Sequence, residues 1–138
     1  MTWKMKMTEE IKLPMGYNGY QLTDQSRDKL MRILWPIHPD VIAHHVTHEY
    51  GVYQSFPPDA TSVRMIAIAA DDKVQAAIVE VNGISERLHG NSFYHITISI
   101  DKSAGGKAVD SNTLIKDRSN WVAIAPVDLA VIPVFITF

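Results

Sequence analysis

Two short motifs carry the residue types that could do chemistry in this chain, His45-Val46-Thr47 and His95-Ile96-Thr97. Each places a histidine and a threonine two residues apart in an apolar run that favours a β-strand. Residues i and i+2 of a strand point to the same side, so each His–Thr pair would share one face. Two such strands lying side by side would bring two imidazoles and two hydroxyls around one small cleft. Such a cleft suits acid–base chemistry on a phosphate ester without a metal.

Histidine and threonine would divide the work at this cleft. The unperturbed pKa of a histidine is ~6.5, so the ring can take up or release a proton near neutral pH. One of His45 and His95 would deprotonate the attacking water or hydroxyl, and the other would protonate the departing oxygen. The hydroxyls of Thr47 and Thr97 would donate to the non-bridging phosphate oxygens and hold the phosphorus in line. The spacing selects His45 rather than His44, because only His45 shares a face with Thr47.

The alternation of residues predicts which side chains accompany the motifs. Along the second strand, His95, Thr97 and Ser99 alternate with isoleucines. We expect this polar face to line solvent or a site while the isoleucines enter the core. Along the first strand the same alternation predicts two faces, one with His45, Thr47 and Glu49 and the other with His44, Val46, His48 and Tyr50.

The motifs His45-Val46-Thr47 and Tyr94-His95-Ile96-Thr97-Ile98 resemble the signature of the two-histidine (2H) phosphoesterase superfamily, a pair of His-x-Thr/Ser motifs between apolar residues. This resemblance implies two α+β lobes, with the motifs facing each other across a central groove. It also implies metal-independent cleavage of a phosphodiester, with the two histidines as the acid–base pair and the two threonines as phosphate anchors. Either histidine can be the acid, because the implied fold is pseudo-symmetric.

We therefore expect an enzyme that hydrolyses a small nucleotide phosphodiester without a cofactor, in RNA processing or cyclic-nucleotide turnover. The candidate substrates are a 2′,3′-cyclic phosphate end, a 2′–5′ linkage and a cyclic oligonucleotide. The alternative from another class is a non-catalytic module that binds a nucleotide in the same groove. A third hypothesis is an interaction protein whose histidines have no chemical role.

Aromatic and basic residues near the motifs are candidates for binding the rest of a nucleotide. A nucleobase needs a flat apolar platform, and the candidates are Tyr17, Tyr50, Tyr94 and Trp121. Lys107 is the preferred phosphate contact, because it follows Gly105-Gly106 soon after the second motif. The other cations considered are Arg64, Arg87 and Lys116. Core or rim packing for an aromatic residue, and a solvated surface charge for a cation, are the alternative roles.

No metal site and no cofactor are predicted. The chain has no cysteine, and four of its six histidines lie between His38 and His48. Their order, His-His-Val-Thr-His-Glu, is not the His-Glu-x-x-His of zinc enzymes, and Val46-Thr47 favours a strand over a helix. There is also no glycine-rich phosphate loop and no dinucleotide fingerprint. His89 is predicted to lie exposed in a loop.

Composition bounds the fold and the partners. A chain of 138 residues suits a single domain, 1–138, with one sizeable core. A net charge of -2 without a basic run argues against a long nucleic-acid duplex and favours a small nucleotide or a nucleic-acid end. Residues 1–15 lack the continuous apolar core of a signal peptide. Pro126, Asp128 and Pro133 interrupt the apolar tail, 121–138, so we expect a buried terminal strand, no membrane contact and a cytoplasmic protein.

Periodicity and turn signals predict the elements that must position the motifs. Thr23 or Asp24 would cap a helix that runs to about Leu34, and Ser111-Asn112 would cap a short helix over 111–116. Strands are predicted over 17–22, 41–50, 62–69, 74–81, 92–100 and 127–137, with a hairpin joining 62–69 to 74–81, a turn at Asn82-Gly83, a loop at Gly105-Gly106 and Pro133 at an edge or bulge. Strands outnumber helices, which predicts an α+β fold with mainly antiparallel sheets, in two lobes around a central groove.

Overall fold

Two antiparallel sheets and two α-helices make up the part of the chain that this computed structural model describes, residues 14–87 and 92–138. The predictions for His89 and for most of 1–15 concern residues outside this part. The elements in chain order are β1 (Met15–Leu22), α2 (Asp24–Ile33), β2 (Asp40–Val41), β3 (His45–Tyr53), β4 (Val63–Ala70), β5 (Val74–Val81), β6 (His95–Ile100), α3 (Asp110–Lys116), β7 (Val122–Asp128) and β8 (Val131–Thr137), with 3-10 turns at Lys102–Ala104 and Arg118–Asn120. The smaller sheet has the order β3-β1-β8 and the larger the order β2-β6-β5-β4-β7. The predicted α+β class with mainly antiparallel sheets is confirmed.

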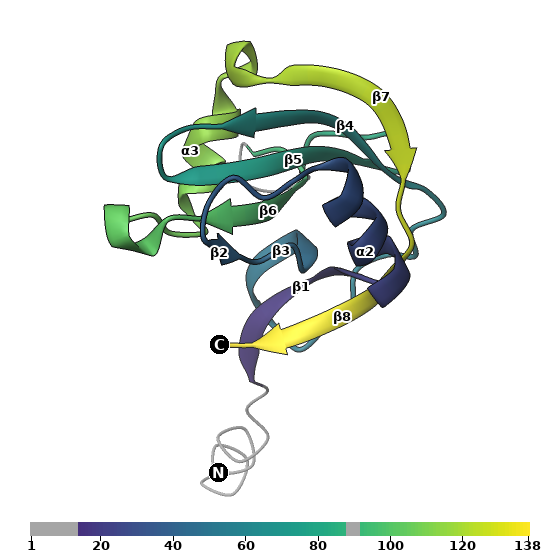
Figure 1. Cartoon of the computed structure of the whole chain (residues 1–138). Helices are drawn as coiled ribbons and strands as arrows, with labels where there is room; N and C mark the ends of the chain where they lie inside the picture. The colour runs from purple at the N-terminus through teal and green to yellow at the C-terminus, as the bar shows by residue number, and fades with distance from the viewer. Residues whose placement is uncertain (1–13, 88–91) are drawn as a thin grey trace, which may run out of the picture.

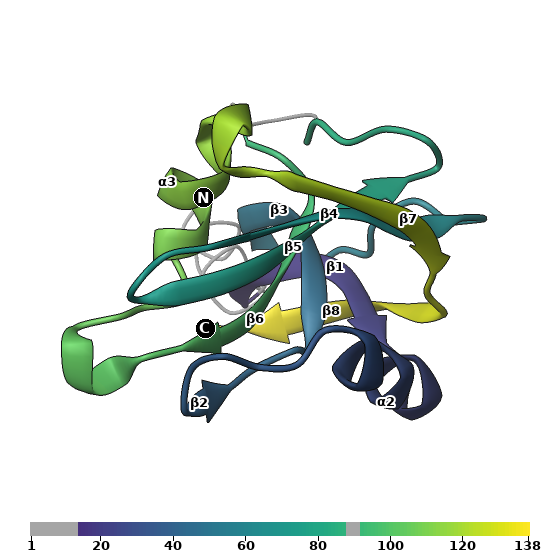
Figure 2. The same ribbon diagram turned by 45° about the horizontal axis from the view of Figure 1, so that its top comes forward.

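The larger sheet, β2-β6-β5-β4-β7 in Figure 1, has a layer of buried apolar side chains on each of its two sides. The first layer lies between this sheet, the smaller sheet and α2, and its buried members include Tyr20, Leu30, Val46, Met65, Val79, Ile96 and Ile98. The second layer lies between β4, β5 and α3, and its members include Ala69, Val74, Ile78, Leu114 and Ile115. The two helices therefore lie on opposite sides of the larger sheet, as Figure 2 shows.

Helix α2 begins and ends where its local signals predict. The Thr23 hydroxyl accepts a hydrogen bond from the amide of Ser26 at 3.2 Å, and the helix is over before Pro36. The hydroxyl of Ser26 in turn accepts from the amide of Ala130 at 2.7 Å. The start of the helix is thereby fastened to the turn between β7 and β8.

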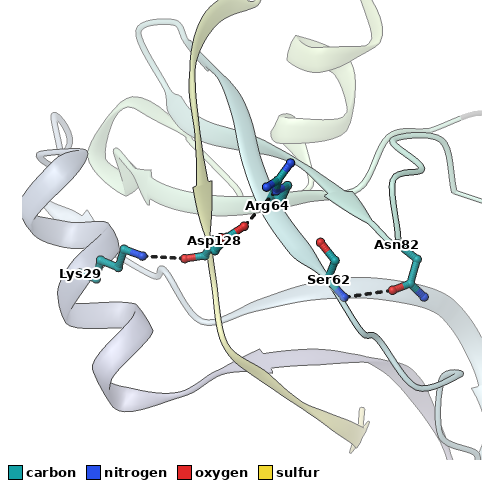
Figure 3. Close-up of polar contacts among 5 residues, drawn as sticks. All are labelled: Lys29, Ser62, Arg64, Asn82 and Asp128. Carbon is teal, nitrogen blue, oxygen red and sulfur yellow. Dashed lines mark hydrogen bonds and ion pairs between the residues drawn. The ribbon is translucent and has the colours of Figure 1, made fainter.

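The predicted hairpin, formed by β4 and β5, and the predicted turn at Asn82-Gly83 are both confirmed. Both turn residues have a positive φ, 52° and 79°, which asparagine and glycine tolerate best. The Asn82 Oδ1 accepts from the amides of Thr61 and Ser62 at 2.8 and 3.1 Å. These bonds tie the turn to the start of β4 (Figure 3).

The single strand predicted over 41–50 is wrong, because the chain changes sheets within it. Strand β2 ends at Val41 in the larger sheet, and β3 begins at His45 in the smaller one. Between them Ala43 has a φ of 43°, a left-handed conformation that is unfavourable for a residue with a side chain. The β-prone composition continues through this kink, so the sequence carries no sign of it.

The C-terminal segment does not form the one buried strand that was predicted. It forms two edge strands, β7 against β4 in the larger sheet and β8 against β1 in the smaller, and most of their residues are at least partly exposed. Each pairs on one side only, so Pro133 lies in an edge strand as predicted. Asp128 of β7 accepts from Arg64 Nε at its carboxylate and from Lys29 Nζ at its backbone oxygen, both at 2.9 Å (Figure 3).

A one-residue irregularity follows each His-x-Thr motif. The pairing of β3 with β1 skips His48, and the pairing of β6 with β5 skips Ile98. Each skipped residue comes directly after the threonine of its motif, and an extra residue moves the side chains that follow to the opposite face. The alternation predicted for each strand is therefore correct as far as the skipped residue and wrong beyond it. Tyr50 joins the motif face of β3, whereas Ser99 leaves the motif face of β6 and is fully buried.

Gly19 lets β1 approach the first motif closely. A Cβ at this position would collide with the backbone carbonyl oxygen of Val46, the central residue of that motif. Backbone atoms cannot turn aside as the end of a flexible side chain can, so a larger residue would push β3 away from β1. The position of the first motif therefore depends on this glycine.

The Gly19→Ala variant should lower the free energy of unfolding by about 3 kcal/mol, because the added methyl must displace the backbone of β3. Urea denaturation measures this loss. Gly83→Ala is the matched control, since its Cβ would meet no atom within 4 Å and only the positive φ of 79° opposes the change. The control should lose about 1 kcal/mol. Equal losses in the two variants would contradict the close approach of β1 to β3.

Candidate active site

The two motifs meet at one pocket with a volume of about 880 Å³. His45 and Thr47 reach it from β3, and His95 and Thr97 reach it from β6. The structure thus brings together all four residues that the sequence singled out for chemistry. The rest of the lining comes from β1, from the remainder of β3, from the segments that precede the motif strands and from α3 with the residues before it, namely Tyr17, Ile42, Tyr50, Arg87, Ser92, Ala108, Val109, Asn112, Thr113 and Lys116.

The motif strands are not hydrogen-bonded neighbours, in contrast to the side-by-side arrangement expected from the sequence. Strand β3 belongs to the smaller sheet and β6 to the larger. The residues just before β3 make the connection, since the amides of Ile42 and Ala43 donate to the carbonyls of Ile98 and Thr97 at 2.8 and 2.9 Å. These two backbone hydrogen bonds hold the start of the first motif strand beside the second motif, at the boundary between the sheets.

A backbone contact determines the tautomer of His95. Its Nδ1 lies 2.9 Å from the carbonyl oxygen of Phe93. A carbonyl can only accept, so Nδ1 carries the hydrogen and the lone pair of the neutral ring is on Nε2. Burial lowers the pKa of His95, the Phe93 carbonyl partly opposes that shift, and the positive charge of Arg87 adds to it. His95 is therefore neutral at neutral pH, the form that a general base requires.

His45 lies between an aromatic ring and a second histidine. Its ring stacks on Tyr17 with centroids 4.9 Å apart, and its Nδ1 lies 3.0 Å from Nδ1 of His44. Burial, and then the charges of His44 and His95, lower the pKa of His45 to about 4. Both motif histidines are thus neutral in the free protein at pH 7. A negatively charged ligand beside them would raise both pKa values.

The hydroxyl of Thr97 is tied to helix α3. Its Oγ1 lies 2.8 Å from Oγ of Ser111, which is fully buried. The prediction that Ser111 caps this helix is wrong, because α3 begins at Asp110 without a side-chain cap and the Ser111 hydroxyl bonds to Thr97 instead. Ser111 does not line the pocket but holds the hydroxyl of Thr97, a role that the sequence did not reveal. A serine inside a helix is informative only once the buried face of that helix is known.

Arg87 and Lys116 are the cations that line the pocket within the described residues. The Nε of Arg87 is buried and has no hydrogen-bond partner in this part of the chain. A buried donor of this kind is unfavourable unless a polar or anionic group meets it. Lys107, the cation preferred from the sequence, does not line the pocket. Its amide donates to the carboxylate of Asp110 at 2.9 Å in the exposed turn before α3.

An aromatic shelf, defined by Tyr17, Tyr50 and Phe138, extends from His45 toward solvent. Tyr17 and Tyr50 are nearly parallel, with centroids 6.2 Å apart and an interplanar angle of 11°. Tyr50 also contacts Phe138 at 5.0 Å between centroids, and these two rings are 69% and 66% exposed. Flat exposed rings at the rim of a pocket can stack on a nucleobase. The register shift after the first motif is what brings Tyr50 to this side.

The other two aromatic candidates do not line the pocket. The hydroxyl of Tyr94 lies 2.8 Å from Nδ1 of His48 in the core. Trp121 packs edge-on against Phe93 and donates from Nε1 to the carbonyl of Ile115 at 2.8 Å. Both have the packing role that the sequence left open as the alternative.

Within residues 14–87 and 92–138, no group of three or more His, Asp or Glu side chains could hold a metal ion. In the same part of the chain no helix is long and apolar enough to cross a membrane. Comparison with known proteins finds no matching family model, no matching curated protein and no matching solved structure.

Acid should destabilise the protein through His45, whose folded pKa of about 4 lies below the unfolded value of ~6.5. Between these values the unfolded chain binds more protons, so stability is present above pH 6.5 and is lost as the pH falls toward 4. The loss attributable to His45 should reach about 3 kcal/mol at pH 4. Urea denaturation gives the free energy of unfolding of the wild type and of His45→Gln at each pH between 4 and 6.5. The free energy should fall more steeply with decreasing pH in the wild type than in His45→Gln. Identical slopes would contradict the buried, neutral state of His45.

Proposed function

We propose that the protein is a metal-independent phosphodiesterase of the two-histidine type, acting on a small nucleotide phosphodiester. The observation that carries this proposal is the convergence of two His–Thr pairs, from two different sheets, on one pocket. The position of the pocket at the boundary between the sheets supports a two-lobed arrangement around a groove, as the resemblance to the 2H superfamily implies.

The four motif residues supply the groups that hydrolysis needs. One histidine takes a proton from water as the water oxygen bonds to phosphorus, and the other gives a proton to the oxygen whose bond to phosphorus breaks. The hydroxyls of Thr47 and Thr97 donate to the non-bridging oxygens and stabilise the charge that develops on them. The guanidinium of Arg87 adds a positive charge at the same pocket, and its Nε has no hydrogen-bond partner among the described residues.

The size and the rim of the pocket favour a nucleotide over a long polymer. Its volume of about 880 Å³ falls within the usual range for small-molecule sites. The aromatic shelf offers a stacking surface for a base, beside the histidines that would meet the phosphate. The net charge of -2 provides no basic stripe for a long nucleic acid. The substrates that fit are a 2′,3′-cyclic phosphate end, a 2′–5′ linkage and a cyclic oligonucleotide.

Replacing either motif histidine should abolish turnover. His45→Ala and His95→Ala should each lower kcat/KM by about a thousandfold, the usual contribution of a general acid or base. The assay is a panel of 2′,3′-cyclic nucleotides, 2′–5′-linked dinucleotides and cyclic oligonucleotides, with products identified by mass spectrometry. His38→Ala is the matched control, because His38 bonds to the carbonyl of Asp71 outside the pocket and should keep full activity.

Three other outcomes of this assay would contradict the proposal. Full activity in either single variant would remove the two-histidine mechanism. Loss of activity in EDTA would show that a metal ion is needed. Binding of a nucleotide without turnover would favour the non-catalytic binding module.

The cations of the pocket can be tested separately. Arg87→Met should raise KM for the phosphodiester about tenfold to a hundredfold, because a charge-assisted hydrogen bond contributes about 1.5–3 kcal/mol. Steady-state kinetics measures the change. Lys107→Met is the matched control, since Lys107 does not line the pocket, and its KM should stay within about twofold of the wild type. A larger rise in KM for Lys107→Met than for Arg87→Met would contradict the binding of the phosphate beside Arg87.

A further inference from the structure

His44 has no part in the chemistry described so far, yet it touches His45 directly. Their Nδ1 atoms lie 3.0 Å apart, and the rings meet edge to face with centroids 5.2 Å apart. Two imidazole nitrogens at this distance form a hydrogen bond only when one of them carries a hydrogen and the other does not. One hydrogen therefore lies between the two rings.

We propose that His44 is a positioning residue that shares this hydrogen with His45, which makes His45 the general acid and leaves His95 as the general base. The inference rests on the proposed phosphodiesterase function and deepens it. It assigns separate roles to two motifs whose histidines the resemblance leaves interchangeable.

The shared hydrogen decides which protons His45 can release. When the pair holds one extra proton, both Nε2 atoms carry a hydrogen and a third hydrogen lies between the two Nδ1 atoms. His45 can then give up its Nε2 proton, keep the bridging hydrogen on Nδ1 and become neutral. The Nδ1 of His44 becomes the acceptor in the same step, so no nitrogen loses its partner. A second extra proton would put two positive rings in contact, which agrees with the part that His44 plays in lowering the pKa of His45.

His95 has a different partner and is therefore suited to the opposite role. Its Nδ1–H is committed to the carbonyl of Phe93, 2.9 Å away, so the neutral ring offers a lone pair at Nε2. Arg87 disfavours a positive charge on the same ring. The two motifs thus differ in what meets Nδ1, a histidine in the first and a carbonyl in the second.

The surroundings of His45 leave His44 as its proton partner. Within the described part of the chain, the titratable and charged groups that line the same pocket are Tyr17 of β1, Tyr50 of β3, His95 of β6, Arg87, and Lys116 of α3. None of them is a carboxylate, and the nearest ring, Tyr17, meets His45 by stacking rather than by a hydrogen bond. Among the described residues, the hydrogen bond recorded for the His45 side chain is the one to His44.

The proposed step balances with water as the only co-reactant. In a nucleoside 2′,3′-cyclic phosphate, the water oxygen bonds to phosphorus while its proton passes to Nε2 of His95. The bond between phosphorus and one ribose oxygen breaks, its electron pair stays on that oxygen, and the oxygen takes the Nε2 proton of His45. Positive charge moves from the His44–His45 pair to His95, and exchange with solvent restores the starting state after the product leaves.

The test compares two leaving groups in variants of His44. A nucleoside 2′,3′-cyclic phosphate needs a proton on the departing ribose oxygen, whereas a p-nitrophenyl nucleoside phosphodiester does not. His44→Phe keeps the ring contact and removes the nitrogen, so kcat should fall about tenfold to a hundredfold on the first substrate and less than about twofold on the second. His44→Asn, whose side-chain carbonyl oxygen can accept from the Nδ1–H of His45, should recover part of the loss. His95→Ala should lose activity on both substrates, because the base is needed for each.

A second readout separates this inference from the proposed function. In ¹⁵N NMR spectra a scalar coupling across the shared hydrogen should link the Nδ1 nuclei of His44 and His45 in the wild type. Absence of this coupling, or equal losses on both substrates in His44→Phe, would overturn the pair while phosphodiesterase activity remained. The coupling in a protein without turnover would overturn the acid–base assignment together with the proposed function.

Discussion

The hydrogen bonds of residues 42–44 hold the two halves of the site together. On one side the amides of Ile42 and Ala43 donate to β6 at 2.8 and 2.9 Å, and on the other the carbonyl of His44 accepts from Leu22 of β1 at 3.0 Å. These three residues belong to no strand, yet they are bonded to both sheets. They therefore fix how far the first motif lies from the second. The left-handed Ala43 makes this crossing possible within so short a stretch, and its backbone bonds offset the strain.

On either side of this connection, the two motifs share a local design. Each His-x-Thr is followed by one residue that its neighbouring strand skips, so each strand turns its motif toward the pocket and then reverses its faces. The consequences differ because the strands belong to different sheets. The reversal brings Tyr50 to the pocket from β3, whereas in β6 it buries Ser99 against Gln75, with a hydrogen bond of 2.6 Å. The two motif strands thus share one local irregularity but differ in the residues around their histidines. The clearest difference is at Nδ1, which meets His44 in the first motif and the carbonyl of Phe93 in the second.

Local signals predicted helix α2, the β4–β5 hairpin and the turn at Asn82-Gly83 correctly, because caps and turn residues act over a few neighbouring positions. The errors arose where distant contacts decide. The kink at Ala43 is held by the carbonyl of Thr97, more than fifty residues away. The tail divides between two sheets because each half finds a different partner strand. The extra residue after each motif is likewise invisible in a pattern that alternates without interruption.

For the site, residue types and spacing were sufficient to single out His45, Thr47, His95 and Thr97, since a strand places residues i and i+2 on one side whatever surrounds it. The sequence by itself determined these two pairs, and the chemistry expected of them stays a prediction. Only the tertiary structure decided what meets them. Arg87 and Lys116 line the pocket, whereas Lys107 does not. The hydroxyl of Thr97 is hydrogen-bonded to Ser111, and the Nδ1 atoms of His44 and His45 lie within hydrogen-bonding distance of each other. Such partners depend on which elements pack together, and that packing is the outcome of the whole core rather than of any local segment.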